Sequence, residues 1–170
     1  TLSGSGDGLT ISGTNTLTIT GTLSQSNGTI TCGTGTIKVG GNWSKTAGTF
    51  TQGTGTLEFN GSSAQAISVN DNPRTLYNLR INNSSGNVSV TSGNLTISNI
   101  LTMSSGNLAI GSNTLTINGT VASMSASNAL TGSATSNLTI GGSGSLGTLY
   151  FDQTTSGTSN NLNNFTVNRS

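Results

Sequence analysis

The chain repeats itself with a period of about 20 residues along part of its length. The motif Gly-Thr-Gly-Thr occurs at Gly33 and again at Gly53, and an apolar-x-apolar triplet follows each copy. Apolar residues also recur at shorter, nearly even intervals, three of which make one period; these positions are Leu17, Leu23, Ile30, Ile37, Trp43, Phe50 and Leu57, then Val88, Leu95, Leu101, Leu108, Leu115 and Val121. A fixed period of this length is typical of solenoids, in which each repeat stacks on its neighbours.

Many of the apolar positions open a short alternating segment. Triplets such as Leu17-Thr18-Ile19 and Leu115-Thr116-Ile117 place two apolar side chains on one side and a polar one on the other, which is the pattern of a β-strand. Gly, Asn and Ser, which favour turns, fill the gaps. Hairpins would also give short strands, but they have no reason to repeat every third strand. The sequence therefore predicts an all-β, single-stranded parallel β-helix (β-solenoid) with three short strands per coil and about eight coils.

The period also predicts which side chains meet. Lys38 and Glu58 lie one period apart at the outward centres of their triplets, so we expect a cross-strand ion pair between adjacent coils. Leu17, Ile37 and Leu57 should form one inward column. Cys32 falls on the inward side of its triplet and is expected to be a small buried core residue, while Trp43 should fill the core or a corner.

Residues 1–170 are interpreted as one continuous solenoid segment with two less regular stretches, 60–78 and 122–148. The first includes Asp71–Arg74, which is expected to protrude because Pro73 cannot pair inside a sheet. Residues 57–84 resemble residues 149–170, which indicates a higher-order repeat of about 90 residues.

The two ends of the chain lack the sequence features expected of a solenoid end. The chain begins without Met and shows no capping sequence after its last coil, although solenoid ends normally need a cap. We therefore expect a piece of a longer product. Self-association, or continuation of the chain, is expected at the terminal coils, around Thr1–Ile11 and Leu162–Ser170.

Composition argues against several functions. The net charge is +1, and the five cations are spread along the chain, so no basic patch for nucleic acid is expected. No apolar run has the length of a membrane span. The chain has no His, which removes the commonest general base and metal ligand. Its four acids, Asp7, Glu58, Asp71 and Asp152, are scattered.

We therefore predict no enzyme activity, no cofactor and no metal site. The one cluster of opposite charges expected from the sequence is Asp71 with Arg74 or Arg80. Gly4–Gly8 superficially resembles a Ca²⁺-binding repeat, but it is a single copy with one acid.

Several phrases resemble the repeats of large secreted bacterial β-solenoid proteins, which are adhesin-like surface and filament-forming proteins. These segments are GTGTLEFNGSSAQAI, LYNLRINNSSGNVSV, GNLTISNILTMSSGNLAIGSNTLTINGTV, and SNLTIGGSGSLGTLYFDQ together with NNLNNFTVNRS. The resemblance implies a right-handed helix, an extracellular or cell-surface location and a structural role in a fibre, filament or adhesin stalk. Its partners would be further copies of itself, with surface glycans as a further partner class. It supplies no catalytic residues.

Two other functions are retained as alternatives. Outward threonine pairs could bind ice; they are Thr16/Thr18, Thr29/Thr31, Thr49/Thr51 and Thr114/Thr116. Against this, Lys38 and Glu58 interrupt one face, and the face of Thr29 and Thr49 is expected to continue as Asn87/Ser89 and Asn107/Ala109. The second alternative is a carbohydrate-binding or carbohydrate-cleaving β-helix. The structural fibre is the preferred prediction.

Overall fold

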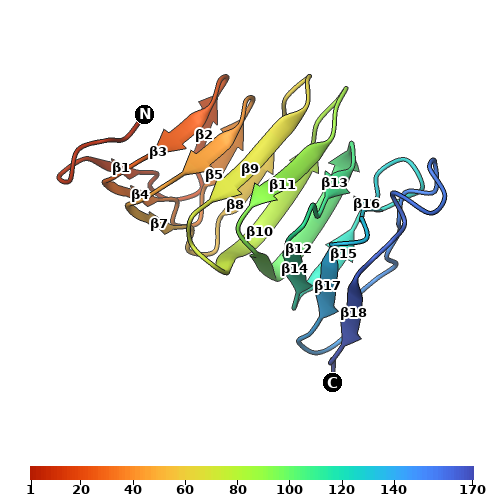
Figure 1. The fold of residues 1–170 in the computed structure, drawn as a ribbon. Helices are drawn as coiled ribbons and strands as arrows, with labels where there is room; N and C mark the ends of the chain where they lie inside the picture. The colour runs from red at the N-terminus through yellow and green to blue at the C-terminus, as the bar shows by residue number, and fades with distance from the viewer.

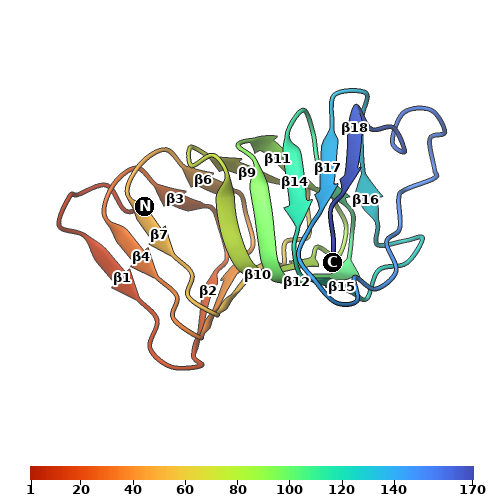
Figure 2. The same cartoon turned by 90° about the horizontal axis from the view of Figure 1, so that it is seen from below.

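The computed structural model describes residues 1–170 as a stack of coils built from β-strands, with no helix (Figure 1). The strands form three parallel sheets, and the two termini lie at opposite ends of the stack (Figures 1 and 2). Sheet A contains β3 (Leu23–Gln25), β6 (Trp43–Lys45), β9 (Gln65–Val69), β11 (Val88–Ser92), β13 (Leu108–Ala109) and β16 (Leu130–Thr131). Sheet B contains β1 (Gly8–Thr10), β4 (Thr29–Thr31) and β7 (Thr49–Thr51).

Sheet C is the largest and runs from one end of the stack to the other. It contains β2 (Thr16–Ile19), β5 (Thr36–Val39), β8 (Thr56–Phe59), β10 (Arg74–Asn82), β12 (Leu95–Ser105), β14 (Thr114–Ile117), β15 (Thr120–Ala122), β17 (Asn137–Ile140) and β18 (Asn164–Val167). The predicted parallel β-solenoid is therefore confirmed. No helix in the chain is suited to crossing a membrane.

The predicted number of coils is too high. Sheet A has six strands, one per turn, which gives about six turns rather than eight. The pairing of Thr16 with Thr36 keeps the period seen in the sequence. Later pairings, such as Trp43 with Ile67 and Asn137 with Asn164, join residues that lie further apart along the chain. The additional residues lie in the corners between strands, so each later turn uses more of the chain.

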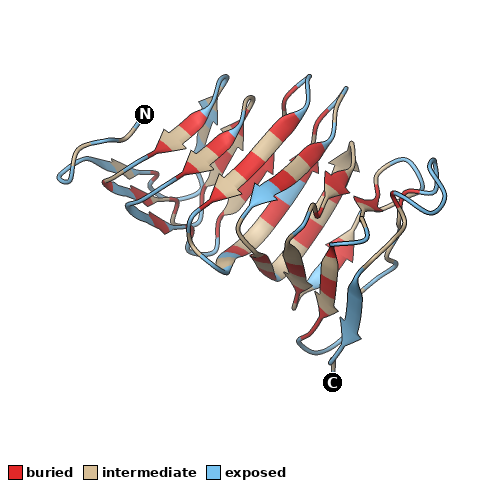
Figure 3. Cartoon of the chain, in the orientation of Figure 1, coloured by how far each residue is buried: buried red, intermediate tan, exposed pale blue.

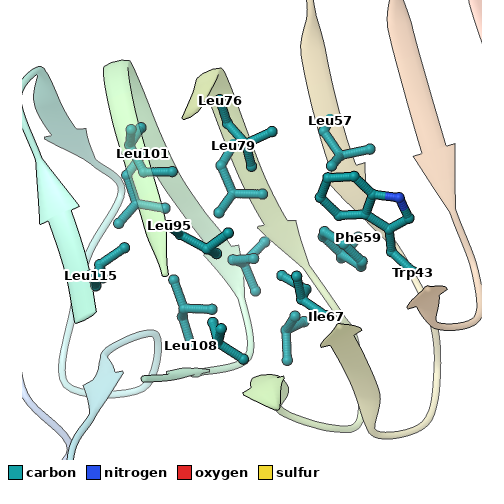
Figure 4. Close-up of a cluster of buried hydrophobic side chains, with 14 of the residues drawn as sticks. Trp43, Leu57, Phe59, Ile67, Leu76, Leu79, Leu95, Leu101, Leu108 and Leu115 are labelled. Atoms are coloured by element: carbon teal, nitrogen blue, oxygen red, sulfur yellow. The ribbon is translucent and has the colours of Figure 1, made fainter. Parts of the chain in front are cut away.

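Inward side chains form continuous columns, as the period predicts. The column that begins with Leu17 continues through Ile37, Leu57, Leu79, Leu101 and Val121. The column is part of one hydrophobic core of 29 buried residues along the stack, and Leu17 packs half-buried against this core. Figure 3 shows the buried positions recurring from strand to strand, and Figure 4 shows some of the core side chains. Cys32 and Trp43 are both buried in this core, as predicted. The Trp43 ring lies 5.0 Å from the Phe50 ring, with the planes tilted by 49°.

Stacked glycines explain the repeated Gly-Thr-Gly-Thr motif. Gly33 and Gly53 have φ angles of 62° and 65°, a region that favours residues without a Cβ atom. A Cβ atom on Gly53 would also collide with the carbonyl oxygen of Gly33 in the coil below. The corner therefore requires glycine for its backbone angle and for the close approach of adjacent coils.

The corner between two sides of the solenoid changes at β10. In the first coils sheets B and C are separate, whereas β10 and β12 each run through both sides as one long strand. Only the second half of β10, Asn78–Ile81, pairs with β8, while its first half, Arg74–Leu76, pairs with β12 alone. A register shift between Leu76 and Asn78 marks the bend. The outer face of sheet C therefore changes shape at this coil.

The core column provides a test of the fold. Leu57 is fully buried between Ile37 and Leu79, so Leu57→Ala should lower the free energy of unfolding by about 2–5 kcal/mol through lost burial and a residual cavity. Urea denaturation followed by Trp43 fluorescence measures this change. The exposed Thr18→Ala is the control and should stay within about 0.5 kcal/mol of wild type. Equal effects of the two substitutions would contradict the stacked column.

Candidate functional site

Three charged side chains lie in one outward column of sheet C. Lys38, Glu58 and Arg80 occupy equivalent positions on β5, β8 and β10. The Lys38 Nζ atom lies 3.8 Å from Glu58 Oε2, which confirms the predicted cross-strand pair. Glu58 is buried although it points outward, and its Oε1 atom accepts a hydrogen bond of 2.9 Å from Asn82 Nδ2. A buried carboxylate on an outer face indicates that this face is hollowed.

The hollow is a groove of about 370 Å³ on the outer face of sheet C. Thr16, Thr36 and Thr56 line it beside the charged side chains, and they form a second column on β2, β5 and β8. The sequence did not place Arg80 here, because the coil that separates it from Glu58 is longer than the period of the first coils. The sequence feature that indicates its outward position is its place at the centre of the Leu79-Arg80-Ile81 triplet.

A second charged cluster fixes the corner before β10. Lys45 Nζ lies 3.1 Å and 3.0 Å from the two carboxylate oxygens of Asp71, and Arg74 also contacts Asp71. The Arg74 guanidinium donates a hydrogen bond of 2.7 Å to the Phe50 carbonyl and lies over the Phe50 ring. Of the two partners expected for Asp71, Arg74 is present, while Arg80 lines the groove instead.

Lys45 belongs to this cluster although the sequence pattern does not predict it there, and its side chain is only 1% exposed. The sequence feature that indicates its burial is its position two residues after Trp43 in β6, which places both side chains on the same inward side of the strand. Burial lowers the pKa of Lys45, and the charge of Arg74 lowers this pKa further. Burial also lowers the pKa of Arg74. One buried and one half-buried cation thus share the Asp71 carboxylate, an arrangement that holds the corner together and offers no acid–base pair.

The remaining side chains that could take part in chemistry form hydrogen bonds with nearby backbone groups. Cys32 Sγ donates to the Gly35 carbonyl at 3.2 Å, and burial raises the pKa of the Cys32 thiol, which disfavours the nucleophilic thiolate. Asp7 accepts a hydrogen bond from the Gly4 amide, and Asp152 accepts one from the Thr154 amide. No three Cys, Asp or Glu side chains gather where they could hold a metal ion.

The threonine pairs expected from the sequence lie on two different sheets of the solenoid. Thr29/Thr31 and Thr49/Thr51 stack on the three-stranded sheet B. The expected continuation of this face as Asn87/Ser89 and Asn107/Ala109 is wrong, because Ser89 and Ala109 pair with each other on sheet A. The added corner residues shift later segments to a different side.

A longer threonine column, which the period of the first coils does not predict, runs along sheet C. It consists of one central outward threonine on each of β10, β12, β14, β17 and β18, namely Thr75, Thr96, Thr116, Thr139 and Thr166. Polar uncharged residues flank it, including Thr114, Asn137 and Asn164 in the adjacent column. This threonine column is free of charge at every position.

The apolar columns reach both ends of the stack. On β18 the side chains of Phe165 and Val167 are 58% and 63% exposed, although they continue the buried column positions of Leu138 and Ile140. At the other end, Leu9 on β1 packs half-buried against the core.

Comparison with models of known protein families, with curated proteins and with solved structures finds no match for this chain.

Two substitutions in the corner cluster should affect the free energy of unfolding differently. Lys45→Met leaves Asp71 paired with Arg74 and removes a buried charge, so the free energy of unfolding should be unchanged or higher. Asp71→Asn leaves Lys45 and Arg74 without their carboxylate and should lower the free energy of unfolding by about 3 kcal/mol. Urea denaturation at pH 7 measures both values. A loss for Lys45→Met as large as that for Asp71→Asn would contradict this account.

The same variant tests the pKa of Lys45. Because this pKa is lowered in the folded chain, the unfolded chain binds more protons between the folded pKa and about 10.4, the ordinary lysine value. Wild type should therefore gain stability relative to Lys45→Met as the pH rises toward about 10.4. Parallel pH profiles of the two proteins would show that the Lys45 pKa is not lowered.

Proposed function

We propose that this chain is a structural segment of an extracellular fibre, filament or adhesin stalk. Two apolar columns of the core end in exposed side chains on β18, and this exposure supports the proposal. Phe165 and Val167 are largely exposed on β18, whereas the residues that precede them in the same columns, Leu138 and Ile140, are buried. A further coil stacked on β18 would cover both side chains and continue the core.

The backbone supports a mechanical role. The chain forms 92 backbone hydrogen bonds, and the parallel pairings join each coil to the next along the stack. A pull along the stack would therefore act on several hydrogen bonds at every junction between coils.

The end strands also leave backbone groups available. β18 pairs with β17 on one side, and its other edge carries unpaired N–H and C=O groups, which are a template for strand addition. We expect this edge to be covered by more of the same chain or by a second copy. The extracellular location is supported by the resemblance to secreted repeats and by the low charge of the Thr-, Ser- and Asn-rich surface.

Self-association through β18 is testable with a double substitution. Wild type should form end-to-end oligomers that lengthen with concentration, because stacking buries Phe165 and Val167. Phe165→Asp combined with Val167→Asp should shift the population to monomers, since each carboxylate would lose hydration on stacking. Analytical ultracentrifugation and electron microscopy measure this shift. Isolated monomers of wild type at every concentration would contradict self-association.

A second candidate function is ice binding, which the threonine column favours. Its five threonines repeat at the strand spacing of about 4.8 Å, and each pairs in register with the threonine of the next strand. A regular, uncharged row of this kind can hold a matching row of water molecules. The column lies apart from Lys38 and Glu58, so the charges of the groove do not interrupt it.

Thermal hysteresis measures ice binding directly. If the threonine column binds ice, wild type should slow ice growth, and Thr116→Lys should abolish most of the effect by placing a charge at its centre. Thr18→Lys, on a strand outside the column, is the matched control and should retain the wild-type value. Absence of hysteresis in wild type, or equal loss in both variants, would exclude this function for the column.

A further inference from the structure

The geometry points to a binding site for an acidic saccharide in the groove on the outer face of sheet C. Arg80 would hold one sugar carboxylate, Lys38, two coils away in the same column, would hold a second, and the hydroxyl groups of Thr16, Thr36 and Thr56 would bind the sugar hydroxyls. The site lies on the side of the stack, so it depends neither on stacking at β18 nor on the threonine column.

The groove is concave because of how the coils are built. It lies on β2, β5, β8, β10 and β12, on both sides of the coil where β10 replaces two separate strands. The side chain of Glu58 is only 4% exposed at the floor of this region, although it belongs to the outward column. The hollow is thus part of the regular backbone and does not depend on a loop.

The charges of the groove favour an anion. Two cations and one carboxylate line it, so its net charge is positive. Glu58 is held by Asn82 at 2.9 Å and by Lys38 at 3.8 Å. Its negative charge is therefore fixed at the floor, while Lys38 and Arg80 carry the charge that a ligand would meet at the surface.

Hydrogen-bonding groups in the groove remain free. Arg80 uses only its Nε–H, which donates to Ser104 Oγ at 3.1 Å, so its terminal nitrogens are available for a bidentate contact with a carboxylate. The Lys38 ammonium makes no hydrogen bond within the chain. The hydroxyl groups of the lining threonines also make none; these are Thr16, Thr36, Thr56 and Thr102.

The same features argue for an extended polyhydroxylated ligand rather than a compact ion. The free hydroxyls follow one another along the stack at about 4.8 Å per coil, and Arg80 stands one coil beyond Thr56. No aromatic side chain lines the groove, so recognition would rest on charge and hydrogen bonds. The groove contains one carboxylate, whereas glycoside cleavage ordinarily uses two, so the site is suited to binding without cleavage.

Isothermal titration calorimetry with trigalacturonate tests the site, with neutral maltotriose as the comparison ligand. Trigalacturonate should bind and maltotriose should not. Arg80→Gln should weaken trigalacturonate binding about 10-fold or more, through loss of a charged hydrogen bond. Binding should also weaken at high salt, where the Debye length falls to about 3 Å.

Two further variants separate this site from general charge effects. Arg169→Gln removes the same charge at the C-terminal end of the chain and should leave the affinity unchanged. Glu58→Gln removes the negative charge from the floor of the groove and should tighten binding. Equal losses for Arg80→Gln and Arg169→Gln, equal binding of maltotriose, or no binding of trigalacturonate would overturn the proposal. Binding of a sulfated trisaccharide in place of trigalacturonate would overturn the assignment to a carboxylate.

Discussion

Parallel hydrogen bonding between adjacent coils is the constraint on which this structure depends. Each coil must follow nearly the same outline as the one below, because its backbone groups pair with that coil residue by residue. The matched outline aligns inward side chains into columns, and it brings the glycines of one corner onto those of the next, as at Gly33 and Gly53. Core, corners and outer columns all follow from this single requirement.

The chain has few charged residues, five Lys or Arg and four Asp or Glu, and their placement therefore carries information. Three lie together in the groove of sheet C, and three form the corner cluster around Asp71. In the cluster the buried Lys45 and the half-buried Arg74 share the Asp71 carboxylate. In the groove Glu58 is held while Arg80 and Lys38 keep free donors, so the two groups are suited to different roles, one structural and one in binding.

One backbone repeat gives surfaces of different character. The threonine column of sheet C is uncharged and regular over five strands, whereas the groove on the same sheet is concave and charged. The exposed Phe165 and Val167 mark a third surface at the end of the stack. A β-solenoid can thus present different lateral surfaces without any change to its core, because outward side chains contribute little to coil packing.

The amino-acid sequence alone predicts the parallel solenoid, the column through Leu17, Ile37 and Leu57, and the Lys38–Glu58 pair, because a constant period fixes the register directly. The three-dimensional structure was needed to establish the number of turns, the burial of Lys45 against Asp71, the place of Arg80 in the groove and the threonine column. These depend on corner lengths, which vary from coil to coil. Since each added corner residue shifts all later pairings, long-range register emerges only when the coils are stacked.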